Sequence, residues 1–174
     1  SLVPTAVRCV AWMRNEMDAW LAHPELAMFD GIMVSSEQAR AAIARVYDGP
    51  TTVLRIGVDP ELFSPPLPGE DRHGVVGTVN YWGKERDLHR ALQAGPTTVP
   101  LALFGHDRAL PPALAGYSAG PVSFFALPGL YRRAAVVLDD FNHTTVGWGN
   151  VNSRLYEALA CGALLDQLDD VVAV

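Results

Sequence analysis

Several kinds of residue are scarce in this chain, and each shortage excludes a class of protein. Only two cysteines, Cys9 and Cys161, occur among the 174 residues, so a disulfide framework is excluded and a reducing, cytoplasmic compartment is expected. The five histidines are scattered, whereas a zinc site needs about four ligands at a recognisable spacing, so we expect no bound metal.

Long apolar runs are also missing. No run approaches the roughly 18 residues that a membrane helix needs. Arg8 follows the apolar residues at the start of the sequence, whereas a signal peptide places its basic residues before them. Neither a transmembrane segment nor a signal peptide is therefore predicted.

Basic residues are fewer than acidic ones, 13 against 19, which gives a net charge of -6. Because a nucleic-acid groove usually carries a basic excess, no nucleic-acid partner is expected. Lys84 is the only lysine, and this preference for arginine, together with abundant alanine, suggests a GC-rich bacterial genome. A hydrophobic content of 49% indicates a globular protein, and the length suits one domain or slightly more.

Short β-rich runs alternate with helical stretches along the whole chain. We predict strands at residues 7–13, 31–34, 51–56, 74–79, 100–104, 122–125, 135–139 and 163–165. We predict helices at 17–29 with a break at Pro24, and at 37–47, 85–94, 111–116, 129–133 and 152–161. This order is typical of an α/β fold with mostly parallel sheets, and the segment 57–73, rich in proline and glycine, is predicted to be a linker or domain boundary.

Ligands of open α/β sheets bind beyond the carboxyl ends of the strands. In the second part of the chain this rule selects four loops, at residues 77–84, 105–107, 126–128 and 140–152. Their glycine and polar residues favour a nucleotide or phosphate ligand. Neither a G-x-G-x-x-G fingerprint nor a Walker A motif is present, so dinucleotide or ATP binding of those kinds is not predicted.

Two basic residues, Lys84 and Arg86, lie at the start of the helix predicted at 85–94. Cations near a helix N-terminus are unfavourable with the helix dipole unless an anion lies there, and a diphosphate would supply that anion. The alternative is that both are solvated surface charges.

The longest loop, DFNHTTVGWGNVN at 140–152, contains further candidates. Gly147 and Gly149 allow the main chain to approach a ligand closely, and Asn150, Asn152 or Ser153 can cap the following helix. The main-chain N–H groups there form an anion site. Trp148 either stacks on a base or an acceptor, or serves as a packing anchor.

Five charged or titratable positions in or near this loop each allow two interpretations. Arg154 and Glu157 either form an ion pair along the helix or bind phosphate and ribose hydroxyls, respectively. His143 is either solvated or an acid/base group that contacts the sugar. Asp140, like Asp139 before it, is either a strand-end cap or an active-site carboxylate.

Three segments resemble GT-B fold glycosyltransferases. LRIGVDPELFSP at 54–65 is similar to the "N-G-V-D...F-P" phrase that joins the two lobes of these enzymes, with Ile56 in place of the Asn. FDGIMVSSEQARAAI at 29–43 resembles the preceding strand and helix. The region 130–164 resembles spore-maturation-protein-like glycosyltransferases with their "R-x-[FY]-E-[AG]-x-A-x-G" phrase, here RLYEALACG. The resemblance covers about residues 29–165.

The resemblance implies a GT-B fold of two Rossmann-like lobes with mostly parallel sheets. Residues 1–65 would be the C-terminal part of the acceptor-side lobe plus the linker, and 66–174 the donor-binding lobe, truncated, so the chain is expected to be a fragment of a longer enzyme. That enzyme would transfer a sugar from a nucleotide-diphosphate sugar to an unknown acceptor hydroxyl, without a cofactor or a metal, as a hexosyltransferase does.

The resemblance also assigns roles to single residues. Glu157 would bind the ribose, and Arg154 matches the arginine of the same phrase. Lys84 or Arg86 would bind the diphosphate. The phosphate and sugar would be contacted by the amides of Gly147, Gly149 and Asn150. The base would be contacted by the main chain of Ala126 and Leu127. His143 and Asp140 are the candidates for a catalytic base.

Two departures from the family pattern limit what the resemblance implies. Gly149 stands where many retaining relatives have a second glutamate, and Gly77-Thr78 replaces their usual Gly-Arg pair. Donor-sugar contacts and stereochemistry therefore do not carry over. A non-catalytic GT-B-like nucleotide-binding or interaction module and a nucleotide-sugar epimerase remain as alternatives.

Overall fold

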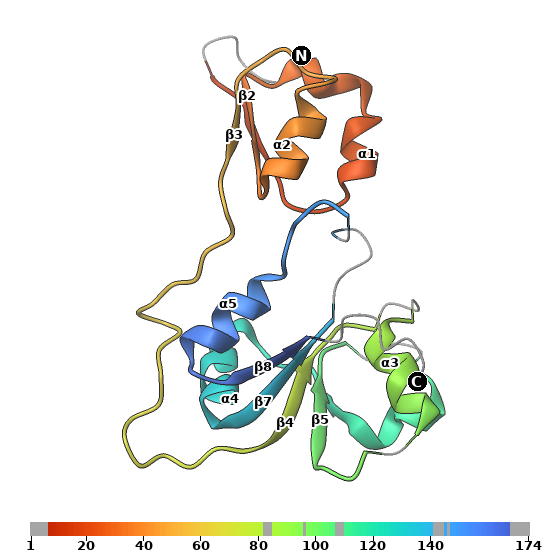
Figure 1. The fold of residues 1–174 in the computed structure, drawn as a ribbon, viewed down its shortest axis with the longest axis vertical. Coiled ribbons are helices and arrows are strands. Elements are labelled where there is room, and N and C mark those ends of the chain that lie inside the picture. Colours follow the sequence, from red (N-terminus) through yellow and green to blue (C-terminus); the bar gives the residue numbers. More distant parts are fainter. Residues whose placement is uncertain are drawn as a thin grey trace. The chain divides into compact units, whose positions relative to one another are not determined.

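The computed structural model describes residues 7–81, 85–95, 97–106, 110–140, 145 and 147–167. The chain forms two compact units: unit 1 comprises Ser1–Ile56 and Asn142–Val151, and unit 2 comprises Gly57–Phe141 and Asn152–Val174. None of the described helices is long and apolar enough to cross a membrane. Each unit is an α/β layer structure (Figure 1).

Unit 1 is built on a three-stranded parallel sheet with the order β1-β2-β3. Its elements are β1 (Val10–Met13), α1 (Met17–Leu21), the 3-10 helix η1 (Pro24–Met28), β2 (Gly31–Val34), α2 (Glu37–Ile43) and β3 (Thr51–Val53). Because right-handed crossovers between strands in this order all lie on one side, the helices cover one face of the sheet. The core between helices and sheet includes Met13, Met17, Ile32, Val34 and Ile43.

Two local signals of the sequence explain how the helices of unit 1 begin. Pro24 is the first residue of η1, which confirms the predicted break in the 17–29 segment. Ser36 is the N-cap of α2, where its hydroxyl accepts a hydrogen bond from the Ala39 N–H at 3.0 Å. This bond satisfies one of the free donors at the helix start.

Unit 2 contains a five-stranded sheet with the order β6-β5-β4-β7-β8, and all of its described strand pairs are parallel. The strands are β4 (His73–Thr78), β5 (Leu101–Phe104), β6 (Ser118–Gly120), β7 (Ala134–Asp139) and β8 (Leu164–Gln167). The helices are α3 (Asp87–Ala94), η2 (Pro112–Tyr117), η3 (Phe124–Ala126), α4 (Leu127–Arg133) and α5 (Ser153–Ala160).

The order of the strands in unit 2 reverses between β4 and β7. The chain moves from β4 to β5 and β6 in one direction, returns through α4 to β7, and then moves to β8 in the other direction. Right-handed crossovers therefore place α3 on one face and α4 with α5 on the opposite face. Two core clusters agree with this division: Leu88 of α3 packs with Leu103, whereas Tyr131 of α4 packs with Ala158 of α5.

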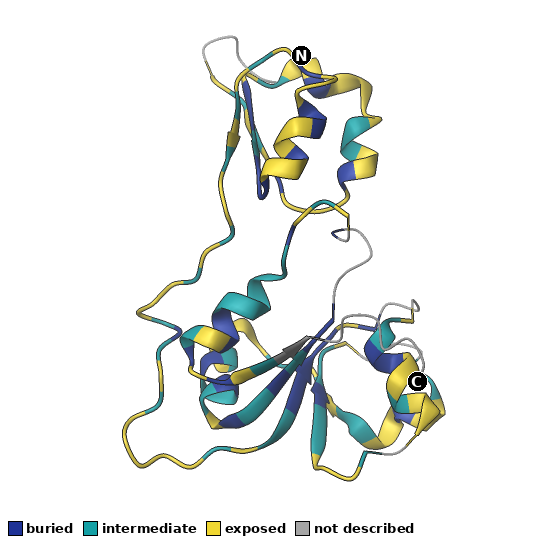
Figure 2. Cartoon of the chain, in the orientation of Figure 1, coloured by how far each residue is buried: buried dark blue, intermediate teal, exposed yellow. Residues whose placement is uncertain are grey.

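The buried residues of both units lie mainly on the sheets and on the inner faces of the helices (Figure 2). Together with the parallel strand pairing, this confirms the predicted α/β fold with mostly parallel sheets.

The proline- and glycine-rich segment 57–73 belongs to unit 2, and the boundary between the units lies between Ile56 and Gly57. Phe63 is only 2% exposed within the unit 2 core. Its ring lies 5.6 Å from that of Phe124 and 6.4 Å from that of Tyr131, measured between centroids. The first part of this segment is therefore packed into unit 2.

Arg72 anchors the second part of the same segment. Its guanidinium donates hydrogen bonds to the main-chain carbonyl oxygens of Ala134 at 3.3 Å and Cys161 at 2.6 Å. Ala134 begins β7 and Cys161 ends α5, so one side chain ties the segment to both elements. A cation at the C-terminal end of α5 also opposes the negative end of the helix dipole.

The strand predicted at 122–125 is wrong. The strand at this edge of the sheet is β6 at Ser118–Gly120, and Phe124–Ala126 form the 3-10 helix η3. The apolar pair Phe124 and Phe125 suggested a buried strand, but Phe125 is 80% exposed. The small residues of β6 have no hydrophobic periodicity, so the sequence pattern did not reveal them.

Candidate functional site

The point in unit 2 where the strand order reverses carries a cluster of charged residues. Arg86 follows β4 as the N-cap of α3, and Arg154 lies in the first turn of α5. Asp139 is the last residue of β7, and Asp140 follows it directly. In open α/β sheets the crevice outside the carboxyl ends of the strands at such a reversal is where ligands bind. The order of the strands thus places these four residues where a ligand is expected.

Asp139 holds Arg154. The Arg154 guanidinium forms an ion pair and hydrogen bond with Asp139 Oδ1. The Asp139 side chain is 1% exposed and that of Arg154 is 19% exposed, so the carboxylate lies beneath the guanidinium. The ion pair of Arg154 therefore runs to the end of β7, which was not one of the two interpretations that the sequence allowed.

Asp140 holds Arg86 and the start of α3. The Arg86 Nη2 atom lies 2.8 Å from Asp140 Oδ1 and donates a hydrogen bond to the Asp140 main-chain oxygen at 3.0 Å. The contact with Oδ1 is an ion pair without hydrogen-bond geometry. Asp140 Oδ2 accepts from the Leu88 N–H at 3.4 Å, so the carboxylate also acts as a cap for the helix.

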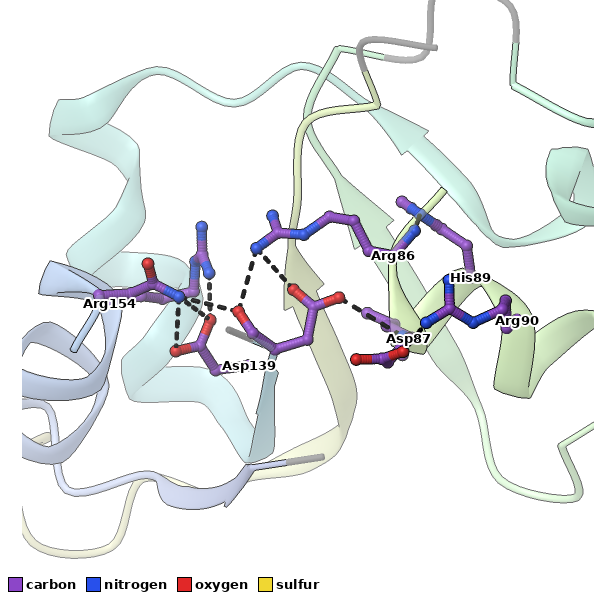
Figure 3. A network of polar contacts seen from close by, with 9 residues as sticks. Arg86, Asp87, His89, Arg90, Asp139 and Arg154 are labelled. Atoms are coloured by element: carbon purple, nitrogen blue, oxygen red, sulfur yellow. Dashed lines mark hydrogen bonds and ion pairs between the residues drawn. The ribbon is translucent and has the colours of Figure 1, made fainter. Parts of the chain in front are cut away.

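Figure 3 shows the polar network that contains Arg86, Asp139 and Arg154, and hydrogen bonds of Asn152 connect its two ion pairs. The Nδ2 group of Asn152 donates to the two carboxylate oxygens of Asp139, at 3.1 and 3.2 Å, and to the main-chain oxygen of Asp140 at 2.8 Å. Asn152 is the N-cap of α5, as predicted among the possible caps, but its side chain binds the end of β7 and makes no capping hydrogen bond.

Burial and charge shift the pKa values of this cluster. Burial raises the pKa of Asp140, and the Arg86 guanidinium opposes that shift. Burial lowers the pKa of Arg86; the Asp140 carboxylate opposes this shift, whereas the Arg154 guanidinium adds to it. The two guanidinium groups are thus close enough to repel each other, and an anion placed against both would offset that repulsion.

Glu157 is 8% exposed in α5, next to a buried pair of hydroxyl groups that sequence analysis missed. The oxygen atoms of Thr78 and Tyr131 lie 2.7 Å apart. Burial raises the pKa of Tyr131 to about 12, and the carboxylates of Glu157 and Asp139 add to the rise. The position of Thr78 at the end of β4 is the only sequence signal that could have found this pair. The ribose-binding role of Glu157 stays a prediction.

Gly147, Gly149 and Asn150 belong to unit 1. Both glycines have positive φ angles, 86° and 64°, which are unfavourable for other residues. The predicted close approach of their main chain to a ligand stays a prediction. The Asn150 side chain is buried, and its Nδ2 group donates to the Arg14 carbonyl at 3.2 Å. Whether the amides of these three residues bind a phosphate or sugar stays a prediction.

Trp148 also packs on unit 1, against its hydrophobic core. The Ser36 hydroxyl donates a hydrogen bond to the Trp148 carbonyl, and the Gln38 amide donates to the Gly147 carbonyl. Of the two interpretations of Trp148, the structure therefore shows a packing anchor.

Four further residues were predicted to belong to the site: Lys84, Ala126, Leu127 and His143. Lys84 and His143 lie outside the described residues. Ala126 and Leu127 lie at the junction of η3 and α4, and the Ala126 N–H donates to the Ser123 carbonyl at 3.0 Å. Within the described ranges no three His, Cys, Asp or Glu residues are grouped so that they could hold a metal ion.

Comparison with known proteins finds similarity among solved structures. No family model and no curated protein matches the sequence. Among solved structures, the chain is similar to sucrose-phosphate synthase from Thermosynechococcus elongatus, with a TM-score of 0.59 and 18% identity. The match covers 90% of this chain and 49% of that enzyme, so the chain spans about half of its length. At this identity the likeness shows a fold like that of GT-B glycosyltransferases.

Proposed function

We propose that this chain is part of a glycosyltransferase that uses a nucleotide-diphosphate sugar, and that residues 66–174 bind this donor. The observation that carries the proposal is the convergence of Arg86 and Arg154 on the end of β7, at the reversal of the strand order. Two guanidinium groups at that position suit a diphosphate, because arginine presents several N–H donors in a fixed plane. The fold shared with sucrose-phosphate synthase supports the same conclusion.

The proposed reaction transfers a sugar without a covalent cofactor. The oxygen of an acceptor hydroxyl attacks the anomeric carbon, the bond between that carbon and the diphosphate oxygen breaks, and the nucleoside diphosphate leaves. The hydroxyl proton passes to a base or to solvent. Arg86, Arg154 and the N-termini of α3 and α5 would stabilise the charge that develops on the leaving diphosphate, a role that needs no metal ion.

The rest of the proposed site follows the family resemblance. Glu157 would accept hydrogen bonds from the ribose, Lys84 would assist at the diphosphate, and Ala126 and Leu127 would contact the base. We propose a hexosyltransferase that acts in the bacterial cytoplasm, the compartment that the shortage of cysteine favours.

A second candidate function is supported by one observation. Both arginines are already paired with buried carboxylates, which is also what a purely structural network would show. A GT-B-like module that binds no nucleotide is therefore the alternative that an experiment must separate from the transferase.

Thermal unfolding in the presence of nucleotides separates the two. We expect one of UDP, ADP, GDP or dTDP, or its glucose conjugate, to raise the melting temperature by several degrees at millimolar concentration, because a ligand of the folded state stabilises it by mass action. Absence of a shift with any of them would overturn the proposed function.

Glu157→Gln tests the ribose assignment. This variant keeps the size of the side chain and removes its charge, so we expect it to lose most of the shift. Glu37→Gln is a matched control, because Glu37 is an exposed residue of α2 that pairs with Arg40 in unit 1. Its shift should equal that of the wild type. Equal shifts for both variants would contradict the role of Glu157.

A further inference from the structure

We propose that Asp139, Asp140 and Asn152 are positioning residues that aim the guanidinium groups of Arg154 and Arg86 at the diphosphate of the donor. The inference rests on the proposed function. It gives Asp140 a role different from that of a catalytic base, since its carboxylate is buried against Arg86 and the start of α3.

The dipeptide at the end of β7 is built to hold two helices. Successive side chains of a strand point to opposite faces of the sheet, and α3 and α5 lie on opposite faces of this one. Asp139 accordingly contacts Arg154 in the first turn of α5, whereas Asp140 contacts Arg86 and the Leu88 N–H at the start of α3. Two helix N-termini and two guanidinium groups are thereby fixed to one dipeptide.

The carboxylates of the cluster are more deeply buried than its guanidinium groups. The two carboxylates are each 1% exposed, whereas the Arg86 and Arg154 side chains are 17% and 19% exposed. An anion that arrives from solvent therefore meets the guanidinium groups first. Each guanidinium has five N–H donors, and the carboxylates use only part of them, so donors remain for a ligand.

Asn152 adds rigidity without adding charge. Its one amide group binds both carboxylate oxygens of Asp139 and the main-chain oxygen of Asp140, so it fixes the Asp139 carboxylate relative to the main chain at Asp140. Groups whose orientation is fixed in advance lose less entropy when they bind a ligand. The network thus prepares both arginines before the donor arrives.

The positioning role and a purely electrostatic role predict opposite results. A carboxylate near a bound diphosphate repels it, so replacing Asp139 or Asp140 by the isosteric Asn should strengthen binding if charge alone matters. If the carboxylates position the arginines, the same replacement should weaken binding, because each guanidinium loses its fixed orientation.

Isothermal titration calorimetry would distinguish the two roles. The probes are inorganic pyrophosphate and the nucleoside diphosphate that gives the largest thermal shift. Asp139→Asn and Asp140→Asn should each weaken binding of both probes about tenfold or more. Binding as tight as that of the wild type, or tighter, would overturn the positioning role while leaving the proposed function intact. If the wild type binds neither probe, the proposed function fails and the inference fails with it.

Asp87→Asn is the matched control. Asp87 also lies at the start of α3 and acts electrostatically on Arg86, but it pairs with the exposed Arg90 of the same helix. Its loss changes the charge by the same amount without releasing either positioned arginine. We expect unchanged or slightly tighter binding, within about threefold of the wild type.

Asn152→Ala keeps the proposal testable if an aspartate variant does not fold, as judged by circular dichroism. The substitution alters no charge and removes only the link between Asp139 and Asp140. We expect binding of pyrophosphate to weaken several-fold. An affinity equal to that of the wild type would overturn the positioning role of the network.

Discussion

The carboxyl edges of the two sheets carry different chemistry. In unit 1 the described side-chain hydrogen bonds at this edge join neutral groups: Ser35 donates to the Met13 carbonyl at 3.4 Å, Ser36 caps α2, and Asn150 binds the Arg14 carbonyl. The Arg14 guanidinium lies over the Trp12 ring, 4.9 Å from its centroid, and no carboxylate is paired with it in the described contacts. In unit 2 the same edge carries two arginine–aspartate pairs.

This difference shows that one architectural rule can give two outcomes. Both sheets are parallel and both present their strand ends to a possible ligand. In unit 1 the chain itself, through Trp148 and Asn150, occupies part of that edge. In unit 2 the guanidinium groups stay partly exposed, so unit 2 has the chemistry for an anionic ligand. The four predictions that follow test this contrast, from the largest expected effect to the smallest.

Phe63→Ala should cause the largest loss and should confine it to unit 2. Phe63 is buried in the unit 2 core, so its truncation should cost about 3–5 kcal/mol through lost burial and a residual cavity. Hydrogen exchange should show lower protection in β4 and β7 and unchanged protection in β1 and β2. Phe125→Ala, at an exposed aromatic residue nearby, should change stability by less than about 0.5 kcal/mol. Equal losses in both units would contradict the division.

Tyr131→Phe should have the second largest effect, because it leaves the buried Thr78 hydroxyl without the partner that lies 2.7 Å away. We expect unit 2 to lose about 1–3 kcal/mol of stability, measured by hydrogen exchange. Tyr156→Phe on α5 serves as the comparison and should cost less. In the wild type, absorbance at 295 nm should show a tyrosine that ionises at a pH of about 12, and Tyr131→Phe should lose that step.

Ser36→Ala should have a smaller effect, in unit 1. The substitution removes the cap on the Ala39 N–H and the hydrogen bond to the Trp148 carbonyl, which together should cost about 1 kcal/mol. Exchange of the amides in α2 and in 147–150 should quicken. Ser36→Thr keeps the hydroxyl and should restore most of the protection. If Ser36→Ala instead changes the amide exchange of unit 2, the hydrogen bonds of Ser36 do not stabilise unit 1 alone, and the contrast between the two units fails.

The smallest expected effect is a pH dependence in unit 2. Burial lowers the pKa of His89 below its ordinary value of 6.5, and the Arg86 guanidinium adds to this shift. Below pH 6.5, His89 therefore binds a proton more readily in the unfolded chain than in the folded chain. The stability of unit 2 should consequently fall as the pH drops below 6.5. His89→Asn retains an acceptor for the Arg86 N–H and should flatten this dependence. An unchanged slope in the variant would show that another group causes it.

Much of the fold could be predicted from the sequence because local signals specified it. The proline at 24, the serine cap at 36 and the β-branched runs each determine a nearby element. Prediction was wrong for β6, where Ser-Ala-Gly lacks any periodicity and the neighbouring exposed phenylalanines gave a false strand. Composition predicted a linker or domain boundary at 57–73. The boundary between the units lies at the start of this segment, between Ile56 and Gly57, and the segment itself is bound to unit 2 by residues such as Phe63 and Arg72.

The candidate site was predictable in its residue types but not in its partners. Sequence analysis identified Arg86, Asp140 and Arg154 from their positions at strand and helix ends. It did not pair them, because Arg86 and Asp140 are 54 residues apart and Arg154 lies 15 residues from Asp139. Asn152 was expected as a helix cap, and its role as a link between two aspartates depends on contacts that no local pattern contains.

The sequence by itself thus determined that strands and helices alternate and that charged residues follow certain strands, because backbone preferences and hydrophobic periodicity act over a few residues. Only the tertiary structure decided which strands are neighbours. The pairing of β4 with β7 brings the ends of two distant strands together and makes one cluster from residues that the sequence keeps apart. That pairing follows from burying both faces of the sheet, a requirement of the whole unit and not of any segment within it.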